Sequence, residues 1–285
     1  MIKPIYEFLM WENCHNKCSF CFQCEKNQLD DLQKKQSIEA TIDFINDENR
    51  FKRGSHVLLV GGELFDSPSI FKDLKKLIDF VIEKLTENYI DLLYVNTNLI
   101  YKNLDGVRYL LDSVDKYNLF ERLKFTTSYD VAGRFANQKV EKLMLDNLTS
   151  LTTNYQKLNV VVNSMLSKQL CQQIIDHQYS INHFREQYRC DVNLIPYIVY
   201  DQQLAGSRKQ IFTALSIIGQ QDPIYLERYI SNFDLHQDKL LYQYKDHKYS
   251  FVSCGNSKCG HSENFKRYST NNSCFICDLK TMFNK

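Results

Sequence analysis

The sequence predicts an α/β fold in which parallel strands alternate with helices. Short apolar runs recur along the first two thirds of the chain, most of them without strict polar alternation. Such runs are typical of strands that are covered on both faces. Amphipathic stretches separate them, and this alternation predicts right-handed βαβ units. Six such units can be counted. A complete TIM barrel has eight, so we expect a partial (β/α)6 TIM-like barrel.

The expected elements follow the chain in order. Strands are expected at Tyr6–Met10, Val57–Val60, Leu92–Val95, Leu123–Ser128, Leu158–Asn163 and Val192–Pro196. The clearest helix carries an apolar stripe from Ile70 to Leu85 at helical spacing. Further helices are expected over Ser37–Asn46, Asp105–Tyr117, Val140–Leu151 and Lys168–His177.

The pattern changes after about Asp201. A helical stretch over Ala205–Ile218 precedes two runs, Leu240–Tyr244 and Tyr249–Ser253, that predict a β-hairpin. A group of four cysteines follows at once. We therefore expect a barrel domain over residues 1–204 and a small cysteine-rich α+β subdomain over residues 205–285.

Composition restricts the class of partner and the compartment. The 285 residues include 35 basic and 34 acidic side chains, for a net charge of +1. This balance gives no electrostatic reason to expect a nucleic-acid or membrane-surface partner. No apolar run is long enough to span a bilayer, and the first residues lack a signal-peptide core. We expect a cytoplasmic protein.

Ten cysteines in such a chain need an explanation. A reducing cytosol disfavours disulfides, so clustered cysteines there more often bind metal or do chemistry. Eight of them form two groups, namely Cys14, Cys18, Cys21 and Cys24, and Cys254, Cys259, Cys274 and Cys277. Cys171 and Cys190 stand alone, and we expect them to be small buried hydrophobic side chains.

The N-terminal group is suited to an iron–sulfur cluster. Cys14, Cys18 and Cys21 lie on one short loop just after the first expected strand. Thiolates are the preferred ligands of such clusters. Three of them can bind three irons of a cubane and leave the fourth iron open to a small molecule. Zinc is the alternative, with Cys24 or His15 as a further ligand. Zinc usually takes ligands in separated pairs, whereas these four cysteines crowd into eleven residues.

The spacing Cys-x3-Cys-x2-Cys, with the aromatic Phe20 before the last cysteine, resembles the signature of the radical S-adenosylmethionine (SAM) superfamily. The resemblance implies a 4Fe–4S cluster on Cys14, Cys18 and Cys21. It also implies that SAM binds the open iron and is cleaved reductively to a 5′-deoxyadenosyl radical, which abstracts hydrogen from a substrate. Phe20 is then expected beside the cofactor. Cys24 is extra to the pattern and is not assigned as a ligand.

The resemblance extends to later strand ends. Gly61-Gly62-Glu63 matches a GGE-type motif that binds the amino group of SAM, with backbone carbonyls from the glycines. Asn98 stands in a segment similar to the Thr-Asn-Gly of relatives, with Leu99 in place of glycine. The resemblance implies further contacts to the ribose, the adenine or the SAM carboxylate from Ser128, Asp130, Arg134 and Asn163. The structural alternatives are a Gly-Gly turn with a solvated Glu and a helix cap followed by a surface Arg.

The C-terminal cysteines form two pairs separated by a short loop. Four such ligands can close a zinc site or hold a second, fully ligated cluster. The arrangement resembles the twitch and SPASM extensions of radical SAM enzymes that act on peptides or proteins, although SPASM domains carry more cysteines. Of the two possible occupants of these cysteines, we favour an auxiliary 4Fe–4S cluster over a structural zinc.

Three hypotheses about function follow. The first is a radical SAM enzyme, of oxidoreductase or transferase type, that modifies a peptide or protein. The second acts on a small metabolite or nucleotide and carries a structural zinc tail. The third is a non-catalytic metal-binding interaction module. Either enzyme would need an electron donor such as flavodoxin or ferredoxin.

Overall fold

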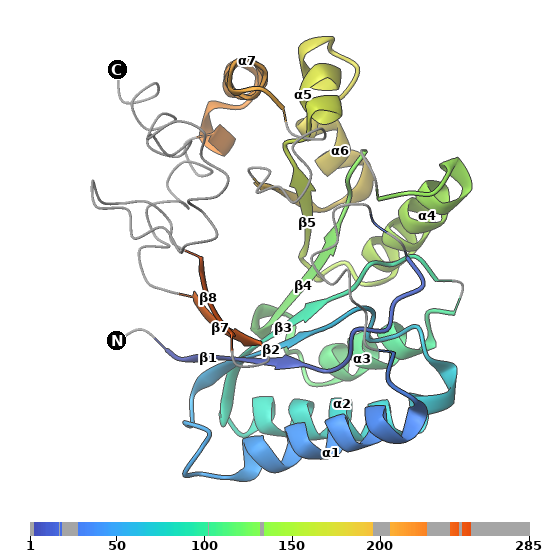
Figure 1. Ribbon diagram of the computed structural model, residues 1–285, viewed down its shortest axis with the longest axis vertical. Coiled ribbons are helices and arrows are strands. Elements are labelled where there is room, and N and C mark those ends of the chain that lie inside the picture. Colours follow the sequence, from blue (N-terminus) through green and yellow to red (C-terminus); the bar gives the residue numbers. More distant parts are fainter. Residues whose placement is uncertain are drawn as a thin grey trace. The chain divides into compact units, whose positions relative to one another are not determined.

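The computed structural model describes residues 3–16, 18, 28–101, 103–131, 134–195, 206–226, 240–244 and 247–251. Its main feature is a six-stranded parallel sheet in which each strand lies beside the next strand of the sequence (Figure 1). The strands are β1 (Ile5–Leu9), β2 (Ser55–Val60), β3 (Ile90–Asn96), β4 (Leu123–Ser128), β5 (Val160–Met165) and β6 (Asp191–Ile195). The α/β prediction is confirmed, and every expected strand is present within about two residues at each end.

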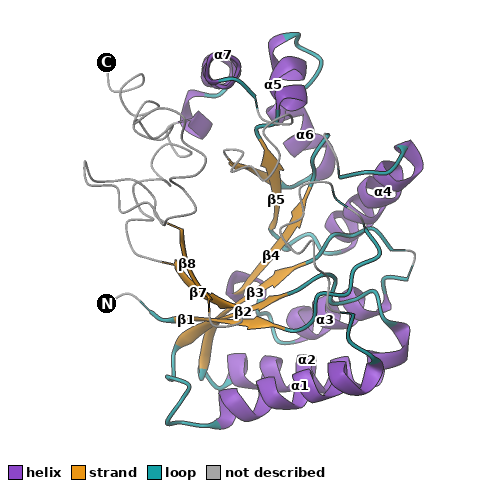
Figure 2. Ribbon diagram, viewed as in Figure 1, coloured by secondary structure: helices purple, strands orange, loops and turns teal. Residues whose placement is uncertain are grey.

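Helices connect the strands. They are α1 (Asp31–Asn46), α2 (Phe71–Thr86), α3 (Asp105–Lys116), α4 (Gln138–Asn154), α5 (Lys168–Ile175), α6 (Ile181–Tyr188) and α7 (Arg208–Gln221), with short 3-10 turns η1 (Pro68–Ile70) and η2 (Phe120–Arg122). The helices α1, α2 and α3 lie along one face of the sheet (Figure 2). The buried stripe predicted for α2 is confirmed, with Leu74, Leu77 and Val81 all at most 2% exposed.

Alternation along the strands shows which face forms the core. Val57 and Leu59 of β2 are 0% and 3% exposed, whereas Leu58 and Val60 are half-buried. The same alternation holds in β4 and β5. Because successive side chains of a strand point to opposite faces, one face of the sheet carries the packed core.

Helix α1 begins six residues earlier than predicted. Asp30 caps its first turn by accepting a hydrogen bond from the Gln33 backbone, and the Gln33 side chain accepts one from the Asp30 backbone. This reciprocal cap satisfies two N–H groups that a helix start otherwise leaves without partners. The first turns are polar, so the apolar pattern alone placed the helix start too late.

The chain divides into two compact units. The first takes in residues 1–129, 133–163 and 185–192, and the second takes in residues 130–132, 164–184 and 193–285. In the second unit, α5 packs against α7, and strands β7 (Leu240–Tyr244) and β8 (His247–Phe251) form an antiparallel hairpin. The predicted hairpin is confirmed, although its second strand begins two residues earlier. Within the described residues, no helix has the length and apolar character needed to cross a membrane.

The two solitary cysteines are buried, as predicted. Cys171 is 0% and Cys190 is 9% exposed. Burial raises the pKa of each thiol to about 12. Since the thiolate is the reactive form of cysteine, these two side chains serve as apolar packing groups.

Candidate functional site

The candidate site lies in the first unit, where the chain leaves the carboxyl ends of neighbouring strands. The segment that carries Cys14 and Cys18 follows β1, the Gly61-Gly62-Glu63 turn follows β2, and Asn98 follows β3. In a parallel sheet all these ends meet at one edge, where α/β proteins bind ligands. The topology therefore brings together segments that are far apart in the sequence.

The two glycines lie directly against the backbone of the cysteine segment. Gly62 N donates to Trp11 O at 2.7 Å, and Glu63 N donates to Asn13 O at 2.9 Å. A Cβ at Gly61 would meet Trp11 O at 2.4 Å, and one at Gly62 would meet Asn13 O at 2.2 Å. No side chain fits at either position, so this close approach of two backbones requires glycine.

Glu63 is a buried carboxylate that joins the ends of β2 and β3. It is 2% exposed. Its Oε1 accepts hydrogen bonds from Thr97 Oγ1 (2.8 Å) and Phe65 N (3.2 Å), and its Oε2 accepts one from Asn98 N (2.6 Å). Burial raises the pKa of Glu63 to about 7, although these hydrogen bonds favour the charged form and oppose the rise.

Cys14 and Cys18 are half-buried, and the sulfur of each faces a side-chain amide. Asn98 Nδ2 lies 3.4 Å from Cys14 Sγ, and Asn16 Nδ2 lies 3.0 Å from Cys18 Sγ. Arg134 Nη1 lies 4.0 Å from Cys18 Sγ, and the arginine is 8% exposed. The structure thus brings Asn98 and Arg134 to the cysteine segment.

Asn16 and Asn13 were not among the predicted site residues. Asn16 sits between the first two cysteines, and its position there is the only sequence signal. Asn13 Nδ2 donates to Leu29 O at 3.0 Å, and Leu29 N donates to Asn13 Oδ1 at 2.9 Å. This pair of hydrogen bonds joins the chain on either side of the cysteine segment, a contact with no periodic signature in the sequence.

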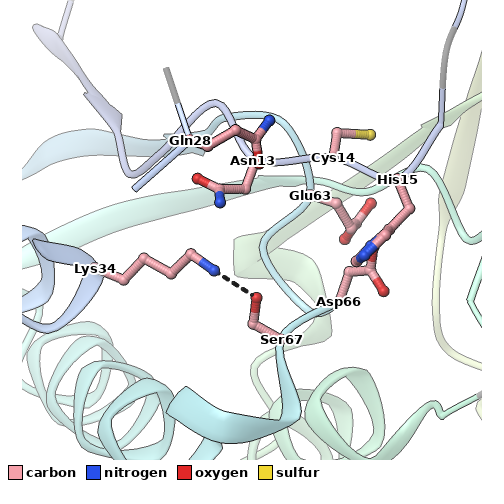
Figure 3. A pocket seen from close by; sticks show the side chains of 8 residues that line it. All are labelled: Asn13, Cys14, His15, Gln28, Lys34, Glu63, Asp66 and Ser67. Atoms are coloured by element: carbon pink, nitrogen blue, oxygen red, sulfur yellow. Dashed lines mark hydrogen bonds and ion pairs between the residues drawn. The ribbon is translucent and has the colours of Figure 1, made fainter. Parts of the chain in front are cut away.

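A pocket of about 180 Å³ opens beside Cys14 (Figure 3). Lys34 of α1 lines it, is only 6% exposed, and donates to Ser67 Oγ at 2.8 Å. His15 contacts the Asp66 carboxylate on another side of the pocket. The His15 side chain is 83% exposed, which fits the predicted loop position, but this contact was not expected.

The remaining residues that were predicted to contact SAM occupy two places. Ser128, the last residue of β4, and Asn163, two residues before the end of β5, are register partners, so these half-buried residues lie side by side. Asp130 belongs to the second unit, where its Oδ1 accepts a hydrogen bond from Met165 N at 2.6 Å. Phe20, Cys21 and Cys24, together with the four C-terminal cysteines Cys254, Cys259, Cys274 and Cys277, lie outside the described residues.

The donor set of the described part is consistent with an iron–sulfur group. Two cysteine sulfurs, which are soft donors of the kind such a group takes, stand close together in the chain, are half-buried and face N–H donors. Outer hydrogen bonds of this kind accompany the ligands of metal centres. Among the described residues, no three His, Cys, Asp or Glu side chains group as a metal site. The third predicted ligand, Cys21, is not among them.

Comparison with known proteins assigns no family. No protein-family model matches the chain, and no curated protein matches it.

Proposed function

We propose that this protein is a radical SAM enzyme that modifies a peptide or protein substrate. One observation carries the proposal: the Cys14 and Cys18 thiols lie at the carboxyl edge of a parallel sheet, in the same unit as the Gly61-Gly62-Glu63 turn, and Arg134 lies beside Cys18. These are the positions that the superfamily resemblance singles out. They come from three separate parts of the chain.

Cys14, Cys18 and Cys21 would hold the cluster. When bound and reduced, a 4Fe–4S cluster with one open iron supplies the electron that cleaves SAM and yields a hydrogen-abstracting radical. The fold contributes shielding, because Cys14 and Cys18 are half-buried and the segment before them packs on the glycine turn. Such shielding keeps water and stray side chains away from a reactive group.

The polar side chains at the strand ends would bind SAM. Arg134 offers a planar fork for its carboxylate. Ser128 and Asn163, adjacent across β4 and β5, would bind the ribose, and Phe20 would lie beside the cofactor.

Gly61, Gly62 and Glu63 would shape the amino-group site. The hydrogen bonds that Glu63 accepts from the β3 segment support a role in holding this geometry.

We also propose that the sheet curves into a partial barrel. Its strands follow one another in sequence order, and α1 to α3 lie on a single face. A doubly wound sheet would instead reverse its order and carry helices on both faces. A barrel interior would give the radical an enclosed space next to the carboxyl edge.

The C-terminal cysteines would bind a second metal group, and they favour a peptide or protein substrate. An auxiliary cluster would give about eight irons per chain, whereas a structural zinc would give about four irons and one zinc. The second result would favour a small metabolite or nucleotide as substrate. In both cases an external donor such as flavodoxin or ferredoxin would supply the electron.

The decisive assay is anaerobic formation of 5′-deoxyadenosine from SAM in the presence of a reductant. We expect product from the wild-type protein and none from Cys18→Ala, because the open-iron cluster needs all three thiolates. Cys190→Ala is the matched control and should retain activity, since Cys190 is a buried packing residue. A wild-type protein that binds iron but forms no product would contradict the proposal.

A further inference from the structure

The two amide–sulfur contacts suggest a role for asparagine that goes beyond binding. We infer that Asn98 and Asn16 raise the reduction potential of the cluster by donating hydrogen bonds to the Cys14 and Cys18 sulfurs. This inference rests on the proposed function, because it concerns the same thiolates. It assigns a positioning role to Asn16, which the superfamily pattern leaves undefined, and gives Asn98 a task distinct from contact with SAM.

The orientation of the Asn98 amide is fixed by its other contacts. Its backbone N–H donates to Glu63 Oε2 at 2.6 Å, and its Oδ1 accepts from Ile100 N at 2.7 Å. Since the oxygen of the amide already faces a backbone donor, Nδ2 is the atom that faces Cys14 Sγ at 3.4 Å. The side chain is held before any ligand arrives, so the donor is preorganised.

Asn16 provides the same chemistry to the next cysteine. Its Nδ2 lies 3.0 Å from Cys18 Sγ, and the residue is 8% exposed. Two different segments, the cysteine loop and the end of β3, thus each supply one N–H group to one sulfur.

The physical consequence concerns charge. Reduction adds one electron from the external donor to the cluster and its thiolates, and no bond to the protein is made or broken. An N–H group aimed at a thiolate stabilises the more negative, reduced state. Hydrogen bonds to the sulfurs are among the factors that set cluster potentials. Both amides are largely buried, which strengthens their effect because the local dielectric is low.

The test is a potentiometric titration of the reconstituted full-length protein, followed by the electron paramagnetic resonance (EPR) signal of the reduced cluster. Asn98→Ala and Asn16→Ala should each lower the equilibrium constant for one-electron reduction roughly tenfold, which is about 59 mV for one electron. Asn96→Ala is the matched control, because Asn96 lies two residues away on β3 and is exposed. It should leave the potential unchanged.

Iron content and the absorption spectrum establish that each variant carries the cluster. If Asn98→Ala fails to fold or load, Asn16→Ala decides, because Asn16 lies on the cysteine segment itself, and not in the segment after β3 that Asn98 supports. Loaded variants with wild-type potentials would overturn the inference alone. Loss of iron from both variants would also overturn it, since the amides would then be needed for assembly. A wild-type protein that binds no cluster would instead refute the proposed function.

Discussion

At the scale of single residues, the site depends on one buried acid. Glu63 ties together the ends of β2 and β3 through three accepted hydrogen bonds, while burial raises its pKa from 4.5 to about 7. Thr97, one of its donors, also lies 2.9 Å from the Tyr101 hydroxyl. A polar network of this kind is stable only when every member is satisfied. Glu63 is therefore expected to carry a pH-dependent share of the stability.

The sign of this pH dependence follows from the raised pKa. Between pH 4.5 and 7 the folded apoprotein holds a proton on Glu63 that the unfolded chain has lost. The free energy of unfolding therefore falls as the pH rises through this window, by about 3 kcal/mol in total. Glu63→Gln has no such proton to lose. Urea unfolding should show that, between pH 5 and pH 8, the free energy of unfolding of wild type falls by about that amount relative to the variant.

Glu39→Gln is the control for this prediction. Glu39 lies in α1, its side chain is 58% exposed, and its only ion pair among the described residues is with Lys35 at 3.9 Å. Its stability relative to wild type should not change with pH. If the free energy of unfolding changed with pH in the same way in wild type and in Glu63→Gln, the raised pKa of the buried Glu63 would be contradicted.

Some residues of the site could be predicted from the sequence and others could not. A cysteine spacing, or a position after a predicted strand, marks some of them in the sequence itself. These are Cys14, Cys18, Asn98 and Arg134. Asn13 and Lys34 act through contacts with residues far away in the sequence, Leu29 and Ser67. Asn16 acts through the local fold of the loop that it shares with Cys18. Such contacts leave no periodic pattern in the sequence, so these residues could not be predicted from it.

At the scale of elements, the tightest feature of the site is the crossing at Gly62, where the backbone of residues 11–13 passes over the turn that follows β2. A Cβ there would stand 2.2 Å from Asn13 O and 2.5 Å from Glu12 O. Both are backbone atoms, so neither can move aside cheaply. The crossing positions the cysteine segment over the turn that follows β2.

Gly62→Ala should therefore displace the cysteine segment. We expect a loss of about 1–3 kcal/mol in the free energy of unfolding, as for other overpacked sites, together with reduced iron binding after reconstitution. Gly54→Ala is the matched control: Gly54 has φ +78° but open space around its Cα, so alanine should cost about 1 kcal/mol in backbone strain and leave iron binding intact. Wild-type stability and iron content in Gly62→Ala would show that the crossing is not rigid.

The helices show where sequence patterns lose information. Helix α2 has an unbroken apolar stripe and was predicted closely. Helix α6 was not predicted, because it is only eight residues long and buries just Ile181 and Phe184. The start of α1 was placed late for a related reason, since its first turns bury only Lys34. Apolar periodicity therefore reveals a helix only where several of its side chains are buried against the core.

At the scale of the whole molecule, strand order is the feature that supports the proposed partial barrel. The order β1 to β6 follows the sequence without a reversal. The apolar strands and the alternating helices predicted an α/β protein, but those patterns are shared by singly and doubly wound sheets. The order itself depends on which strands pair, and that is set by long-range packing. The carboxyl edge in the first unit then gathers the cysteine segment, the glycine turn and Asn98.

Cys14, Cys18 and Cys21 are proposed to hold a cluster with one iron open to SAM. The most direct test uses the full-length chain with Cys254, Cys259, Cys274 and Cys277 replaced by alanine, so that only the N-terminal site remains. After anaerobic reconstitution we expect about four irons per chain. The EPR spectrum of the reduced protein should change on addition of SAM, because its amine and carboxylate occupy the open iron. A spectrum indifferent to SAM, or a single bound zinc, would contradict the account.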